Sequence, residues 1–409
     1  MRTNGDIAIT GVGVVSPVGA GRDAYWEALF RGTSGIRPIT LFDAAPYPLA
    51  VAGEITDFDP LPILGKKGLR DLDRSTRLLC SAAKMALEDS GLTITEESTH
   101  ATGVSVGATY GSLHSISQFD RSGLIEGPRA VNPSHFPNTV LNSPASQVSI
   151  RFRIKGFNTT ISTGFCAGLD AVSYAADFIK TNRADSAVAG GVEELCEETF
   201  LYFHHLGYLS GAGGPALSCP FDARRNGIIP GEGAAVLVLE REEQAATRGT
   251  NVLAKVLGCG NCFDPFADGS FDSAGRGLAT AIQNALRNAS LTPEDIDYVC
   301  SAANSTRGLD RMETKVLKQV FGQHCRKMPV SSIKSMIGES YSASGAMALA
   351  AAVGALQRDL IPPTANYRDK DPDCDLDCVP GPAREAHLRH VLVVAADPYG
   401  ANSAVILGR

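Results

Sequence analysis

The stretch that most limits what this chain can fold into is residues 156–170, GFNTTISTGFCAGLD. It begins with strand-forming, β-branched residues, and Gly164 and Gly168 then allow a sharp turn and close packing. Small and apolar residues recur at helical spacing over residues 168–180. The pattern predicts a β-strand that stops at a tight turn and continues as a helix.

Such a turn places a side chain at the N-terminus of a helix. Free backbone N–H groups and the helix dipole favour negative charge there. An enzyme would hold a nucleophile at this point. We therefore expect the functional site of the chain to be built around this turn.

The composition excludes several classes of protein. The chain has 409 residues, enough for a large core or two fused halves. A formal net charge of −7 argues against a nucleic-acid partner. No apolar run has the length of a membrane span, and the N-terminal residues lack the layout of a signal peptide. The expectation is a cytoplasmic protein with no membrane partner.

Most of the ten scattered cysteines are interpreted as small buried hydrophobic residues. Cys259 with Cys262 and Cys374 with Cys378 could instead form a zinc site, but the spacing between the pairs is long and no nearby histidine completes a ligand pattern. The glycines of residues 11–13 also lack the third glycine of a dinucleotide-binding fingerprint. We expect neither a metal nor a cofactor.

Strand and helix patterns alternate along the chain, which predicts parallel sheets covered by helices on both faces. The strands are predicted at 6–19, 101–109, 183–194, 234–240, 251–257, 296–302, 329–335, 391–396 and 403–407, and the helices at 24–31, 77–91, 111–125, 168–180, 275–288, 312–320 and 345–357. A second half begins near Gly249, so the predicted domains are 1–249 and 250–409. Residues 159–176 and 329–350 share a strand, a glycine-containing turn and an alanine-rich helix, as duplicated halves should.

Two motifs resemble those of β-ketoacyl-acyl carrier protein synthases. Residues 10–19, TGVGVVSPVG, are similar to the family's TGxGxxSPxG, and residues 220–240, PFDARRNGIIPGEGAAVLVLE, are similar to PFDxxRxGxxxGEGAxxLVLE. The resemblance implies an α/β thiolase fold. Two similar βαβαβαββ halves would form a five-layered αβαβα arrangement.

The same resemblance places unreactive residues where the family keeps its chemistry. The family's nucleophilic cysteine falls on Phe165, and Cys166, one residue later, should point about 100° away. The two histidines fall on Ala302 and Glu339. The second oxyanion donor, in the family's F-G-F-G-G-T-N motif, falls on Pro398, which has no N–H.

Glu339 is expected to pair with Lys334, a structural role. The other family signatures are intact, and the resemblance therefore implies a fold retained for a non-catalytic task. The resemblance implies a chain-length factor, the inactive subunit of a ketosynthase heterodimer in type II polyketide or polyene synthesis. Chain-length factors more often carry Gln at the position of Phe165.

In this interpretation a partner ketosynthase performs the condensation, and an acyl carrier protein presents acyl and malonyl chains. This chain supplies the far end of the acyl tunnel. The family places residues 111–125 and 133–137 at the dimer interface and along the tunnel. The candidates for these roles are Leu113, Ile116, Phe119, His135 and Phe136.

Two enzymatic alternatives remain open at this point. Cys166 could act as a displaced nucleophile for acyl transfer or hydrolysis, with Glu339 or His135 as base, because a helix start would lower its pKa. A plain elongating homodimeric ketosynthase would need cysteine and histidine at positions that hold neither.

A small basic cluster lies within residues 61–77 and comprises Lys66, Lys67, Arg70, Arg74 and Arg77. It is interpreted as a solvated helix face, with contact to an acidic carrier protein as the alternative.

Overall fold

The computed structural model describes residues 6–271 and 274–409. In these residues an 11-stranded sheet runs in the order β11-β10-β14-β15-β9-β1-β8-β7-β5-β6, with β2 paired to β1 off this path. The strands of its N-terminal part are β1 (Ile7–Ser16), β8 (Gly233–Arg241), β7 (Ser186–Glu193), β5 (Thr102–Gly107) and β6 (Asn158–Ile161). Those of its C-terminal part are β9 (Ala254–Phe263), β15 (Ala401–Gly408), β14 (His390–Ala396), β10 (Tyr298–Cys300) and β11 (Val330–Ser331).

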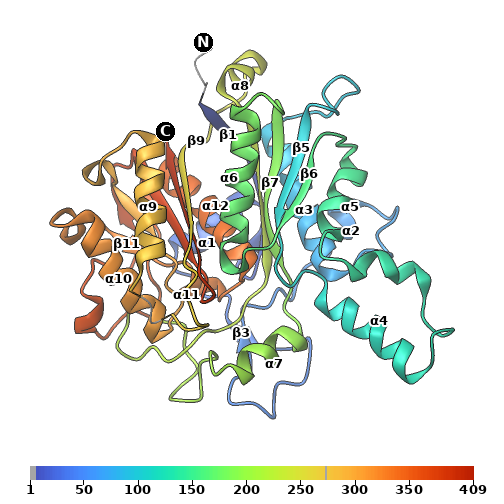
Figure 1. Cartoon of the computed structure of the whole chain (residues 1–409), viewed down its shortest axis with the longest axis horizontal. Coiled ribbons are helices and arrows are strands. Elements are labelled where there is room, and N and C mark those ends of the chain that lie inside the picture. The colour runs from blue at the N-terminus through green and yellow to red at the C-terminus, as the bar shows by residue number, and fades with distance from the viewer. Residues whose placement is uncertain (1–5, 272–273) are drawn as a thin grey trace.

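Helices lie on both sides of the strands and between the two parts of the sheet (Figure 1). The middle helices are α6 (Ala167–Lys180) and α12 (Ser342–Arg358). The outer helices of the N-terminal part are α3 (Arg74–Ser90) and α5 (Ser143–Phe152). The outer helices of the C-terminal part are α9 (Arg276–Ala289) and α10 (Arg307–Phe321). This arrangement gives the five αβαβα layers that the thiolase fold requires.

The remaining elements are short or peripheral. They are β2 (Gly19–Ala20), α1 (Arg22–Phe30), β3 (Arg37–Pro38), β4 (Val51–Ala52), α2 (Leu61–Leu64), α4 (Leu113–Ile125), α7 (Glu197–His205), α8 (Glu242–Arg248), α11 (Lys334–Ile337), β12 (Leu360–Ile361), β13 (Arg384–Glu385) and the 3-10 segments η1 (Pro133–Thr139), η2 (Gly164–Cys166), η3 (Pro293–Asp295), η4 (His324–Arg326) and η5 (Pro372–Cys374).

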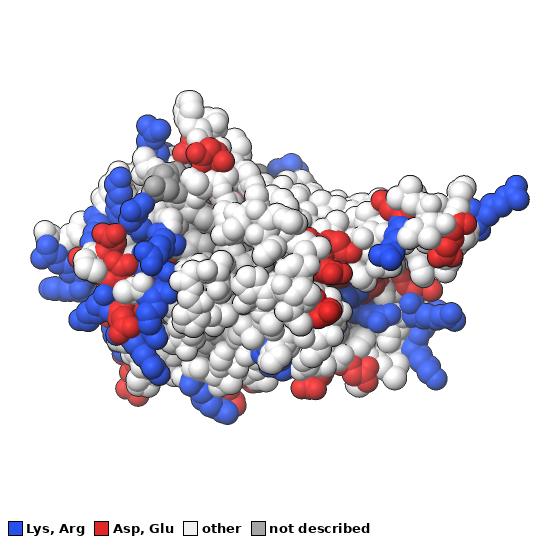
Figure 2. Space-filling view, turned by 90° about the horizontal axis from the view of Figure 1, so that it is seen from below, with Lys and Arg blue, Asp and Glu red and all other residues white. Residues whose placement is uncertain are grey.

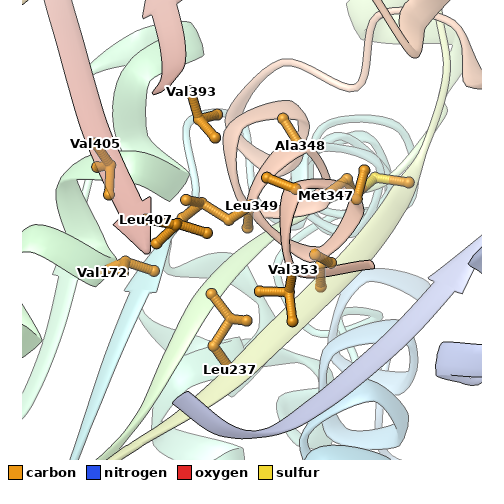
Figure 3. Packing of buried hydrophobic residues seen from close by; sticks show 14 of the residues in the cluster. Val172, Leu237, Met347, Ala348, Leu349, Val353, Val393, Val405 and Leu407 are labelled. Atoms are coloured by element: carbon orange, nitrogen blue, oxygen red, sulfur yellow. The ribbon is translucent and has the colours of Figure 1, made fainter. Parts of the chain in front are cut away.

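Helix α12 lies within the core, and its residues from Ser342 to Leu356 are all buried. Apolar side chains of α6, α12, β8, β14 and β15 meet there, among them Val172, Leu349 and Val405 (Figure 3). Glycine allows the two middle helices to touch, because a Cβ added to Gly168 would lie 2.5 Å from the carbonyl oxygen of Ser342. The close packing predicted for Gly168 is confirmed.

The expectation of parallel sheets is only partly correct, because the sheet is mixed. β5 runs parallel to β6 and β7, and β10 to β11 and β14, but β1, β8, β9 and β15 pair with their neighbours antiparallel. A parallel pair needs a long crossover, usually a helix, whereas β14 and β15 are joined directly by the turn at residues 397–400.

Several boundaries also differ from the sequence prediction. β9 continues to Phe263, because it pairs with β15 along its length up to Phe263 opposite Ala401. The predicted strand at 329–335 is only Val330–Ser331, and α11 follows it. Helix α3 starts before residue 77, because the side chain of Asp73 caps it by accepting the N–H of Thr76 at 2.9 Å.

Helix α4 and segment η1 form an arm that extends away from the body of the molecule beside α5 (Figure 1). Leu124, near the end of α4, is 86% exposed, and Phe136 on η1 is 60% exposed. A single chain thus leaves large apolar side chains of the arm in water. None of the helices in the described part of the chain is both long and apolar enough to cross a membrane.

Candidate functional site

The predicted strand, turn and helix are all present at residues 158–180. Strand β6 ends at Ile161, the 3-10 turn η2 follows, and α6 begins at Ala167. Gly164 has φ 59°, the left-handed region that favours glycine. A Cβ on this residue would lie 1.9 Å from Oδ2 of Asp397, so the turn also depends on glycine for space.

Phe165 stands at the centre of the site and is 2% exposed. Its ring centroid lies 5.5 Å from that of Tyr341 and 6.0 Å from that of Phe203 on α7. We call the linked rings around it the aromatic cluster, which comprises Tyr110, Phe165, Phe203, Tyr208, Phe271 and Tyr341. Buried and half-buried aromatic rings therefore occupy the space in front of the helix start.

The backbone N–H of Phe165 is also engaged. It donates a hydrogen bond to Oδ2 of Asp397 at 3.1 Å, and Oδ1 of Asp397 accepts the N–H of Tyr399 at 2.8 Å. Burial, and more weakly the charge of Glu339, raises the pKa of Asp397. The adjoining Pro398 is buried, and its carbonyl accepts the N–H of Gly269 at 3.2 Å.

Sequence reasoning did not single out Asp397. The signal was present, because the family's F-G-F-G-G-T-N motif has glycine at this position and glycine has no side chain to reach the turn. The hydrogen bond to Phe165 depends on two segments 232 residues apart. A comparison of short motifs could not have shown this contact.

Ala302 lies at the end of the strand-like segment after β10 and is 1% exposed. Its N–H donates to Oε1 of Glu313 at 3.2 Å, and its carbonyl accepts a hydrogen bond from Nζ of Lys334 at 2.8 Å. Burial raises the pKa of Glu313 to about 7. The methyl group of Ala302 offers no group that transfers a proton.

Glu339 is 1% exposed, and all its polar contacts are internal. Its Oε2 accepts from Nζ of Lys334 at 2.8 Å and from Nδ2 of Asn304 at 2.9 Å. Its Oε1 accepts from the hydroxyl of Ser344 at 2.7 Å and the N–H of Tyr341 at 3.1 Å. The expected pair with Lys334 is confirmed, and the carboxylate acts as a buried structural anchor.

Cys166 lies on the opposite side of the turn from Phe165. It is fully buried in the core between α6 and α12, whereas Phe165 belongs to the aromatic cluster. Burial, together with the negative charges of Asp170 and Asp397, raises the pKa of the Cys166 thiol well above its usual value. The expectation of a lowered pKa is wrong, because loss of hydration outweighs the helix start.

The two bases considered for Cys166 are not placed to serve it. Glu339 is held by Lys334, Asn304 and Ser344. His135 is exposed on the arm, where its ring nitrogen lies 3.4 Å from Nδ2 of Asn132. Both proposed bases therefore have polar partners other than Cys166.

The structure brings the five tunnel and interface candidates together on the arm rather than around Phe165. Leu113, Ile116 and Phe119 lie on α4 and are half-buried, while His135 and Phe136 lie on η1 and are exposed. The rings of Phe119 and Phe136 pack with centroids 6.0 Å apart and connect the two segments.

The basic cluster is not one helix face. Helix α2 ends at Leu64, and Lys66, Lys67 and Arg70 follow on an exposed loop. Arg74 instead binds the buried Glu232, with Nε 2.7 Å from Oε2. Figure 2 shows that Lys and Arg gather toward both ends of the molecule on the face seen from below, with a largely uncharged middle.

The described residues contain no group of three or more His, Cys, Asp or Glu side chains that could hold a metal ion. In these residues the two cysteine pairs considered above do not form a zinc site.

Comparisons with known proteins cover most of the chain. The N-terminal domain of β-ketoacyl synthases matches residues 4–245, and the C-terminal domain matches residues 253–368. The chain therefore belongs to the β-ketoacyl synthase family, as the motifs implied.

Individual relatives match over nearly the full length. The chain is 39% identical to the tetracenomycin polyketide synthase ketoacyl synthase alpha subunit of Streptomyces glaucescens, covering 98% of this chain and 97% of that protein. It is 36% identical to 3-oxoacyl-[acyl-carrier-protein] synthase 2 of Coxiella burnetii, covering 98% of both.

Solved structures agree with the fold. The ishigamide ketosynthase/chain length factor superimposes with a TM-score of 0.93 at 34% identity, covering 99% of both chains. A type II polyketide acyl-carrier protein in complex with its ketosynthase bound to the hexaketide gives a TM-score of 0.91 at 26% identity, covering 99% of both chains. The thiolase-fold prediction is confirmed.

Proposed function

We propose that this chain is a non-catalytic chain-length factor. It would pair with an active ketosynthase and shape the acyl tunnel in type II polyketide or polyene biosynthesis. The observation that carries the proposal is Phe165, because a buried phenyl ring at the start of α6 has no atom that could hold an acyl chain. Covalent catalysis by this family needs a thiolate at that point.

The other groups that condensation requires are missing as well. Loss of CO₂ from a malonyl unit and stabilisation of the enolate need two imidazoles, and Ala302 and Glu339 supply a methyl group and a carboxylate. A carboxylate would repel both the malonyl carboxylate and the enolate. Pro398 has no N–H to donate to the thioester oxygen.

The scaffold around these positions remains well connected. Asp310 accepts the N–H of Phe221 at 2.7 Å, and Asp222 accepts the N–H groups of Arg368 and Asp369 at 2.6 and 2.9 Å. Retained structural contacts beside missing reactive groups favour a fold kept for assembly rather than a decaying copy.

The surface supports pairing through the end of the sheet. Strand β6 is the last strand on that side and leaves one edge unpaired (Figure 1). Beside it, the rings of Phe157, Tyr174 and Phe178 pack together with centroids 4.4–6.0 Å apart, and Ile150 is 69% exposed. An open strand edge flanked by exposed apolar side chains and by the arm is a suitable surface for a partner.

The proposal includes an acyl carrier protein as the second partner. The exposed Lys66, Lys67 and Arg70 offer positive charge to an acidic protein. Arg74 is excluded from this surface because it neutralises Glu232.

The test is co-expression with the cognate ketosynthase. Size-exclusion chromatography and native mass spectrometry should show one heterodimer, and the heterodimer with malonyl-loaded carrier protein should extend acyl chains. The chain purified alone should not join malonyl and acyl units. Either a stable homodimer that ignores the ketosynthase, or condensation by the chain alone, would refute the proposal.

The arm provides a prediction about product length. Leu113→Ala and Phe136→Ala should each lengthen the products of the heterodimer, because they would remove bulk from the proposed floor of the tunnel. Mass spectrometry of the released products measures this effect. Leu124→Ala is the matched control, since Leu124 lies on the same arm and is 86% exposed. Unchanged lengths in both test variants would remove Leu113 and Phe136 from the tunnel.

A further inference from the structure

The start of α6, where backbone N–H groups favour an anion, is occupied by a carboxylate of the protein itself. Oδ2 of Asp397 accepts the N–H of Phe165 at 3.1 Å. Gly164 makes this approach possible, because a Cβ there would lie 1.9 Å from the same oxygen. The turn and the carboxylate therefore fit each other, and no substrate oxygen could take this N–H without displacing Asp397.

Asp397 is held in place by the turn that joins β14 to β15. Its N–H donates to the carbonyl of Ala401 at 2.9 Å, and its carbonyl accepts the N–H of Gly400 at 3.2 Å. Its other carboxylate oxygen accepts the N–H of Tyr399 at 2.8 Å. The turn fixes the backbone of Asp397, and its carboxylate can rotate aside only by giving up the N–H groups of Phe165 and Tyr399.

The charge around Phe165 also opposes an anionic ligand. Glu339 is a buried carboxylate close enough to raise the pKa of the partly buried Asp397. The nearby Lys334 already donates to Glu339 and to the carbonyl of Ala302, both at 2.8 Å. A malonyl group would add a further negative charge to a largely buried site that has no unused cation beside Phe165 among these contacts.

We propose that Asp397 is a specificity-determining residue that excludes acyl and malonyl thioesters from this subunit's own pocket by occupying the N–H of Phe165. The inference rests on the proposed function and deepens it, because loading and decarboxylation are then confined to the ketosynthase partner.

The reaction that tests this exclusion is decarboxylation of malonyl-carrier protein. The bond between the α-carbon and the carboxylate breaks, CO₂ leaves, and the electron pair passes into a thioester enolate. A proton from water then gives the acetyl thioester. The enolate oxygen needs an N–H donor, and the N–H of residue 165 is free to serve only when Asp397 is absent.

The experiment uses the heterodimer, with both active-site histidines of the ketosynthase replaced by alanine to lower its background. Phe165→Gln introduces the residue more usual in chain-length factors and should give almost no decarboxylation. Phe165→Gln with Asp397→Gly should raise the rate about 10²-fold, the scale of one oxyanion hydrogen bond. Release of CO₂ and the acetyl product are both measured.

The matched control is Phe165→Gln with Asp397→Asn. Its amide oxygen can still accept the N–H of residue 165, so the rate should stay near that of Phe165→Gln. In the same heterodimer with Phe165 retained, ¹⁵N-phenylalanine labelling should show the Phe165 amide signal moving on Asp397→Gly. Phe165→Leu identifies the signal by its loss.

Three results would overturn the inference: rapid decarboxylation by Phe165→Gln alone, no gain on adding Asp397→Gly, or an equal gain with Asp397→Asn. Each of these rates is interpreted only for variants that form a heterodimer of the same mass as the unmodified one. Failure to form a heterodimer with the unmodified chain would instead count against the proposed function, so the two failures are distinguishable.

Discussion

Glu339→Ala is expected to lower the free energy of unfolding by about 3–5 kcal/mol, because it leaves the buried ammonium of Lys334 without its partner. The side chains are 8% exposed for Lys334 and fully buried for Glu339, so water cannot replace the lost carboxylate. The fluorescence of Trp26, the only tryptophan, reports unfolding in urea. Trp26 is buried against α12, where its Nε1 donates to the carbonyl of Ala350 at 2.8 Å.

The matched control removes the charge at both ends of the pair. Lys334→Met with Glu339→Gln should be more stable than Glu339→Ala, because the glutamine can still accept from Asn304 and no buried charge is left unpaired. A loss below about 1 kcal/mol in Glu339→Ala would contradict the structural role assigned to this pair.

Thr160→Pro should weaken binding of the ketosynthase about 10- to 100-fold, the effect of losing one buried backbone hydrogen bond at the joined strands. The N–H groups of Val104 and Ala108 donate to the carbonyls of Phe157 and Ile161 at 2.8 and 3.0 Å. Successive residues of a strand direct their backbone N–H and C=O groups to opposite sides. Since Phe157 and Ile161 face β5, the N–H of Thr160 points to the open edge of β6. Proline at this position removes a donor that the single chain does not use.

Thr160→Val is the control, because it keeps the N–H and a β-branched side chain. Heterodimer affinity is measured by titration of labelled subunits, and the melting temperature of the separate chain shows whether proline disturbs the fold. Equal affinity for the proline and valine variants, with the fold intact, would show that the partner does not add to the sheet at β6.

The turn at residues 156–170 and the helix after it were predictable because their signals are local. Strand formers, two glycines and an apolar helical repeat lie within one short stretch. The same holds for the Lys334–Glu339 pair, whose members are five residues apart. The direction of the strands was not predictable in this way, because the pairing of β1 with β8 and β9 joins distant segments.

The same difference between local and long-range signals applies to the residues of the site. Phe165 could be identified as unreactive from its place in a motif. Its ring contacts with Phe203 and Tyr341 and its hydrogen bond to Asp397 depend on packing between segments far apart in the sequence. The raised pKa of Cys166 agrees with its interpretation as a buried hydrophobic residue and not with the lowered pKa that the alternative of a nucleophile required.

The contact between Asp397 and the turn at Phe165 has a consequence for how such a subunit can evolve. A cysteine arising at position 165 would find its amide already bonded to a carboxylate and no imidazole nearby. Changes in several unconnected segments would be required together before any of them brought an advantage. If the chain is a non-catalytic subunit as proposed, a return to independent catalysis would therefore need several changes at once.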